Sequence, residues 1–148
     1  MLNKALDIAY KAHWGQTDKA GTPYKLHPTR VALHCQTEDE KIVALLHDVV
    51  EDTSMTLEEL KAQGFSNEVL AALKCLTQIE DEDYQTFIQR VATNPLAVKV
   101  KIQDLKDNMD LSRLDGKPHW KMETYKKALD YLEQCSNKKV LYVDMDNV

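Results

Sequence analysis

The sequence predicts an all-α protein. Apolar residues recur at spacings of three and four through most of the chain, which is the period of a helix with one buried face. The alternation of apolar and polar residues that marks a half-buried strand is scarce. Only four glycines and four prolines occur among the 148 residues, so little interrupts the helical pattern.

The composition describes one globular domain. A chain of 148 residues is long enough for one sizeable core, and 43% hydrophobic with 29% charged residues is an ordinary globular balance. The net charge of −5 argues against non-specific binding to nucleic acid. An anionic ligand would therefore have to be attracted by a local basic patch or by a metal.

The cysteines and the apolar runs suggest where the protein works. Cys35, Cys75 and Cys135 are odd in number and far apart, which argues against a disulfide framework and favours a reducing cytoplasm. The N-terminal residues 1–15 contain polar side chains throughout and do not resemble a signal peptide. No run approaches the roughly 20 apolar residues that cross a bilayer, so we expect no membrane association.

Helix starts can be located in the first half of the chain. A first helix is expected over about residues 2–14, and Pro28, which a first helical turn tolerates, places a second from there to about Cys35. Thr37 to Glu40 form a capping box that opens a third helix. Because that helix is apolar almost all round, we expect it to be the central one.

The rest of the chain contains five more helix signals. They are a capping box at Thr56 with a stop near Gly64, a cap at Ser66 for a helix to about Leu76, a helix over about 83–93 behind a solvated acidic run, a break at Asn94-Pro95 that starts the next helix, and a last helix over about 118–133.

The tail differs from the rest. Val140 to Val143 is a strand-type run, and the sequence continues as Asp144-Met145-Asp146. Residues 139–148 resemble the first strand and catalytic loop of a haloacid-dehalogenase-type nucleotidase. We therefore expect a domain over residues 1–138, followed by the truncated start of a nucleotidase domain from a longer fusion. The alternative is an irregular C-terminal tail.

The strongest chemical signal is the segment from His47 to Asp52. His47, Asp48, Glu51 and Asp52 place four ionisable groups within six positions at the end of an otherwise apolar helix. Burying neighbouring acids is costly unless a cation relieves it, and histidine with carboxylate suits manganese, zinc or iron. The alternative is a solvated helix end, where acids are common.

Two further residues could complete a metal site. His27 precedes Pro28 at a helix start, and Asp104 lies on a helix whose apolar positions include Ile102. Asn108 follows Asp104 by one turn and could bind a substrate oxygen. By themselves, His27 also suits a surface loop and Asp104 a charged helix surface.

These segments carry a family resemblance. GTPYKLHP with His27, ALLHDVVEDTSMTLEEL with His47, and VKIQDLKDNM with Asp104 are similar, in order and spacing, to the HD phosphohydrolase superfamily. The similarity is greatest to the hydrolase domain of RelA/SpoT-type alarmone enzymes and their small stand-alone relatives. It covers about residues 5–133.

The resemblance implies an all-helical HD-domain bundle, a bound Mn²⁺ or other divalent metal, and specific residue roles. It implies His27, His47, Asp48 and Asp104 as metal ligands. It also implies that Glu51 and Asp52 position or activate the hydrolytic water, as a carboxylate beside a metal can.

The nucleotide pocket matches the family less fully. Lys19 matches a nucleotide-contacting lysine, but Asp18 stands where the family usually has an arginine that stacks on guanine. Lys121 and Tyr125 resemble a phosphate-contacting pair, with a surface lysine and a packing tyrosine as the alternative. His34 is expected to be a packed or surface histidine.

The resemblance implies a metal-dependent phosphohydrolase of a phosphorylated nucleotide, similar to a (p)ppGpp 3′-pyrophosphohydrolase. Asp18 leaves a second enzyme open, a phosphatase acting on another nucleoside phosphate or on NADPH. A third hypothesis is a degenerate domain that binds nucleotide as a sensor, against which the Glu51-Asp52 pair argues.

Overall fold

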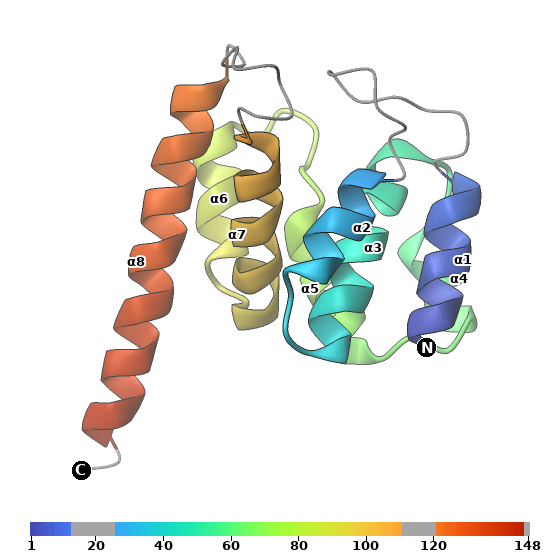
Figure 1. The fold of residues 1–148 in the computed structure, drawn as a ribbon, viewed down its shortest axis with the longest axis horizontal. Helices are drawn as coiled ribbons and strands as arrows, with labels where there is room; N and C mark the ends of the chain where they lie inside the picture. Colours follow the sequence, from blue (N-terminus) through green and yellow to red (C-terminus); the bar gives the residue numbers. More distant parts are fainter. Residues whose placement is uncertain (13–25, 111–120, 147–148) are drawn as a thin grey trace.

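The computed structural model describes residues 1–12, 26–110 and 121–146, and within these ranges it contains eight helices and no strand (Figure 1). The all-α prediction is confirmed. The helices are α1 (Leu2–Ala12), α2 (Leu26–Leu33), α3 (Glu38–Asp52), α4 (Leu57–Ala62), α5 (Asn67–Leu76), α6 (Tyr84–Val91), α7 (Pro95–Asn108) and α8 (Met122–Asp146).

Helix α3 is central, as its all-round apolar character predicts. It packs against α1, α2, α5 and α7 (Figure 1). Every residue from Ile42 to His47 is buried, and so is Val49. Burial of most of α3 stabilises the core, and it also brings His47 into the interior, while the acids at the end of the helix stay exposed.

Local capping explains where the helices begin. The Thr37 hydroxyl accepts a hydrogen bond from the Glu40 backbone N–H at 3.1 Å and donates to Glu40 Oε2 at 3.1 Å. Thr56, Ser66 and Asn94 accept equivalent bonds from the N–H three residues later. Each bond satisfies a donor that the first helical turn leaves without an intrahelical partner.

The acidic run before α6 is more than a solvated helix start. Asp83 caps the helix, and its Oδ1 accepts from the Thr86 N–H at 2.7 Å. Glu82 instead pairs with Arg90 at 2.9 Å. The Arg90 guanidinium also donates to the carbonyl oxygens of Lys74 and Thr77, so it fastens the end of α5 to α6.

The strand predicted at residues 140–143 is wrong, because these residues lie in α8, which runs to Asp146. A strand needs a neighbouring strand for its hydrogen bonds, and the described ranges contain none. A helix that has already begun gains one backbone bond for each residue it adds. The relation of residues 139–148 to a second domain stays a prediction.

Three helices bring the site together. Helices α2, α3 and α7 pack against one another pairwise, although residues 34–94 separate the first from the last. The candidate metal ligands lie where these helices meet. In the described part of the chain, no helix combines the length and the apolar character needed to cross a membrane.

Candidate metal centre

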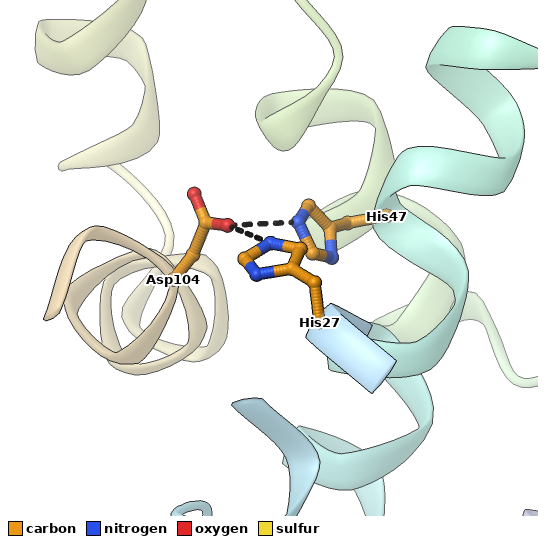
Figure 2. A group of neighbouring side chains, drawn as sticks. All are labelled: His27, His47 and Asp104. Carbon is orange, nitrogen blue, oxygen red and sulfur yellow. Dashed lines mark hydrogen bonds and ion pairs between the residues drawn. The ribbon is translucent and has the colours of Figure 1, made fainter. Parts of the chain in front are cut away.

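Three buried side chains from three helices meet at one point. His27 lies in the first turn of α2, His47 on α3 and Asp104 on α7 (Figure 2). Asp104 Oδ1 is 2.9 Å from His27 Nε2 and 3.3 Å from His47 Nε2. One potential ligand atom from each residue lies within 4.8 Å of the other two. This spacing suits a shared cation.

Asp48 adds a second carboxylate to the group. Its Oδ1 is 3.3 Å from His47 Nε2, and its Oδ2 is 3.7 Å from His27 Nε2. Its side chain is 14% exposed, whereas the side chains of His27, His47 and Asp104 are 5%, 5% and 6% exposed. The structure therefore brings together all four residues that the sequence nominates as ligands, with Asp48 on the more open side.

The outer nitrogen of each imidazole has its own partner. His47 Nδ1 lies 2.7 Å from the Ala44 carbonyl oxygen, and His27 Nδ1 lies 2.5 Å from Asp107 Oδ2. Neither a carbonyl oxygen nor a carboxylate can donate, so both Nδ1 atoms carry the hydrogen. In the neutral rings the lone pair is then on Nε2, which faces Asp104. Ligand histidines are held in this way in metal sites.

Two other side chains of α7 donate hydrogen bonds to the Asp104 carboxylate. Lys101 Nζ donates to Asp104 Oδ2 at 2.9 Å, and the Asn108 side-chain amide donates to Oδ1 at 3.4 Å. Lys101 is one turn before Asp104 and Asn108 one turn after it, so both share its face of α7. The lysine contact leaves Oδ1 facing the two imidazoles.

The charges of the centre are strongly coupled. Burial disfavours the charged form of His27, but bonds to Asp104 and Asp107 outweigh it and raise the pKa of His27 to about 10. Burial also opposes protonation of His47, yet Asp48 and Asp104 raise its pKa to about 9. Lys101 and the imidazoles overcome burial and hold the pKa of Asp104 well below its usual range.

This donor set fits a divalent metal. Two imidazole nitrogens and two carboxylates are suitable ligands for manganese, zinc or iron. A cation at the centre would replace the Nε2 protons of the imidazoles, since ligand histidines are neutral. The same carboxylates that hold those protons would then face the metal.

Glu51 and Asp52, the two acids nominated for catalysis, are exposed at the end of α3. Glu51 Oε2 accepts a hydrogen bond from the Gln78 backbone N–H at 3.2 Å. Glu51 follows His47 by one turn and therefore lies on the same side of the helix. Its carboxylate is accessible from solvent while its helix is anchored in the core.

The nominated substrate-binding residues are only partly described. Asn108 contacts Asp104, as above. Lys121 immediately precedes α8 and is half-buried, and Tyr125 is half-buried with its ring centroid 6.4 Å from that of Tyr84. Burial, aided by Asp104 and opposed by Lys101, raises the pKa of Tyr125. Lys19 and Asp18 lie outside the described residues.

Sequence reasoning missed Lys101 and Asp107, which contact nominated ligands, and Arg30, which contacts Asp107. Each lies three positions from His27 or Asp104, and this spacing was the available signal. The same spacing also fits a solvated, charged helix face. His34, by contrast, is exposed, and its Nδ1 donates to the Arg30 carbonyl oxygen at 2.8 Å.

Curated relatives share this region of sequence. The chain is 32% identical over 120 residues to guanosine-3′,5′-bis(diphosphate) 3′-pyrophosphohydrolase of Aquifex aeolicus. The aligned region covers 73% of this chain and 17% of that protein. The chain is 40% identical over 82 residues to the protein of the same name from Borreliella burgdorferi, covering 53% of this chain and 12% of that protein. The chain thus spans less than a fifth of the length of these relatives.

A solved structure shares the fold. It is described as a metazoan ortholog of SpoT that hydrolyzes ppGpp, and it superposes with a TM-score of 0.70 over 93% of this chain and 92% of that one, at 24% identity. No family model matches the chain. By sequence the chain is a relative of the RelA/SpoT-type (p)ppGpp hydrolases, and by fold it matches a solved SpoT ortholog.

Proposed function

We propose that this chain is a metal-dependent phosphohydrolase domain that cleaves the 3′-pyrophosphate from guanosine 3′,5′-bis(diphosphate). The observation that carries the proposal is the buried convergence of His27, His47 and Asp104, with Asp48 beside them. The activity for which the relatives are named supports the choice of substrate, although the chain spans only a small part of each relative.

The four ligand candidates would hold the metal, and we favour Mn²⁺. A divalent metal here would supply a Lewis acid for a phosphoryl oxygen and lower the pKa of water. His27 and His47 present Nε2 because their Nδ1 hydrogens have acceptors. Lys101 holds Asp104 Oδ2, which keeps Oδ1 directed at the imidazoles.

The remaining residues would act on water and substrate. Glu51 and Asp52 are exposed carboxylates one turn after His47 and Asp48 on α3, and they would take the proton of the attacking water. The Gln78 N–H orients Glu51 through Oε2. Asn108 would contact a substrate oxygen, and Lys19, Lys121 and Tyr125 would contact the nucleotide.

Asp18 supports a second candidate, hydrolysis of a different nucleotide. A carboxylate cannot stack on guanine as a guanidinium does, and it repels phosphate. The substrate would then be another nucleoside phosphate or NADPH, cleaved at the same centre.

The test is a nucleotide panel with the purified chain and Mn²⁺, following release of pyrophosphate and phosphate. We expect pyrophosphate from guanosine 3′,5′-bis(diphosphate), lost in His47→Ala and strongly reduced in Glu51→Gln. His34→Ala and Glu58→Gln are matched controls at exposed positions and should retain activity.

Each alternative gives a different result. Cleavage of another nucleotide in preference would establish the second candidate. Binding of nucleotide without turnover by the metal-loaded protein would favour the sensor hypothesis. Unchanged turnover in His47→Ala would rule out the metal assignment.

A further inference from the structure

The two imidazoles of the centre are anchored by acceptors of different charge. His47 Nδ1 bonds to the neutral carbonyl oxygen of Ala44, within its own helix. His27 Nδ1 bonds to the Asp107 carboxylate, which comes from α7. His27 therefore contacts α7 through both ring nitrogens, Nε2 at Asp104 and Nδ1 at Asp107.

Asp107 is in turn held by Arg30. Arg30 Nε donates to Asp107 Oδ1 at 2.8 Å, and Nη2 donates to Oδ2 at 3.1 Å. This is the two-bond geometry in which guanidinium and carboxylate fix each other's orientation. The Asp107 side chain is 10% exposed and that of Arg30 is 26% exposed, so water competes little for the carboxylate.

Helix geometry explains why this pair lies beside the metal ligands. Arg30 is three residues after His27 on α2, and Asp107 is three residues after Asp104 on α7. Residues three apart share a helix face, so the ligand pair and the Arg30–Asp107 pair form successive contacts between the same two helices.

We propose that Arg30 and Asp107 are positioning residues of the metal centre, which hold the His27 ring so that its Nε2 lone pair faces the metal. The inference rests on the proposed metal site. The Asp107 charge keeps the hydrogen on Nδ1 and makes the opposite nitrogen a stronger donor. Arg30 acts through Asp107, because its two bonds fix the plane of the carboxylate whose Oδ2 receives the His27 hydrogen.

Co²⁺ titration of the full chain tests this without measuring hydrolysis, because the visible absorption of bound Co²⁺ reports both affinity and ligand geometry. Asp107→Asn keeps the shape and an acceptor oxygen but removes the charge. We expect it to weaken Co²⁺ binding about 10- to 100-fold, as loss of such an outer partner does. Arg30→Gln should weaken binding less, and Arg30→Lys less again.

A double variant separates positioning from general damage. If Arg30 acts through Asp107, the Asp107→Asn/Arg30→Gln protein should bind Co²⁺ about as tightly as Asp107→Asn alone. If the losses in Co²⁺ affinity of the two single variants instead add in the double variant, Arg30 does not act through Asp107 and the inference is overturned. Asp130→Asn and Lys126→Gln, on the exposed side of α8, remove the same charges and should leave the affinity unchanged.

The outcomes distinguish this inference from the proposed function. Wild-type affinity in Asp107→Asn overturns the inference and leaves the metal centre standing. A wild-type chain that binds no Co²⁺ overturns both. If Asp107→Asn does not fold by far-ultraviolet circular dichroism, Arg30→Gln decides, and unchanged affinity there also overturns the inference.

Discussion

Replacing Asp104 by asparagine should destabilise the protein even when no metal is bound. The side chain is 6% exposed and keeps its shape in this variant, so the change removes charge and little packing. Asp104 contacts three groups that carry positive charge, Lys101 at 2.9 Å and the imidazoles of His27 and His47 at 2.9 and 3.3 Å.

The loss of folding free energy depends on whether each of the three cations can release its proton once the Asp104 charge is removed. The imidazoles can release a proton at neutral pH once the carboxylate is gone. Lys101 cannot easily do so, and its side chain is only 13% exposed. Breaking a buried ion pair by removing one partner costs about 3–5 kcal/mol. Because the imidazoles relax, we expect a loss at the lower end, about 3 kcal/mol.

Urea unfolding followed by circular dichroism in the presence of EDTA measures this free energy. With a slope of about 2 kcal/mol per molar urea, a loss of about 3 kcal/mol lowers the midpoint by about 1.5 M. Asp130→Asn, at an exposed position of α8, is the control and should leave the midpoint unchanged.

A second substitution checks the reasoning. Lys101→Met removes the buried ammonium that Asp104→Asn leaves without its carboxylate, so the double variant should be more stable than Asp104→Asn alone. The reasoning is refuted if Asp104→Asn unfolds at the wild-type midpoint, or if the losses of the two single variants simply add.

Four further predictions concern the centre and the fold. Mn²⁺ at about 100 times its dissociation constant should stabilise the wild type by about 2.7 kcal/mol, seen as a higher melting temperature that EDTA reverses. In His47→Ala the same Mn²⁺ should give no shift, while His34→Ala should keep it. Thr37→Ala removes the cap of α3 and should cost about 1 kcal/mol in urea unfolding, and a wild-type midpoint would contradict the capping role. Leu46→Ala should cost about 2–5 kcal/mol because this side chain is fully buried, and a loss below 1 kcal/mol would contradict its place in the core.

Much of the fold could be read from local chemistry. Thr37, Thr56, Ser66 and Asn94 cap helices where the sequence places caps, because a cap depends on a hydroxyl or amide and the three residues that follow it. Gly64 follows α4 with a φ of +100°, a conformation that glycine adopts readily. Such interactions are contained within a few residues and need no knowledge of the rest of the fold.

At residues 140–143, local sequence preferences predicted the wrong secondary structure. β-branched residues at 140 and 143 favour a strand, but propensity is a weak preference that context overrides. The helix that precedes them continues through them to Asp146. The interpretation of Glu82 fails for a similar reason. Its charge predicts a solvated side chain, whereas the structure pairs it with Arg90, eight residues further along the chain.

The sequence by itself determined the helical class, the helix starts and the acidic end of α3, because periodicity, caps and the HDxxED segment are local patterns. Its resemblance to the HD superfamily supplied the four ligand candidates. Only the tertiary structure decided that His27 and Asp104, separated by 77 positions, meet at 2.9 Å. It also decided that Arg30, Lys101 and Asp107 support them. On an isolated helix these three would be ordinary surface charges. Arg30 and Asp107 gain each other as partners only because α2 and α7 pack together, whereas the bond of Lys101 to Asp104 lies within α7 and the same packing buries it.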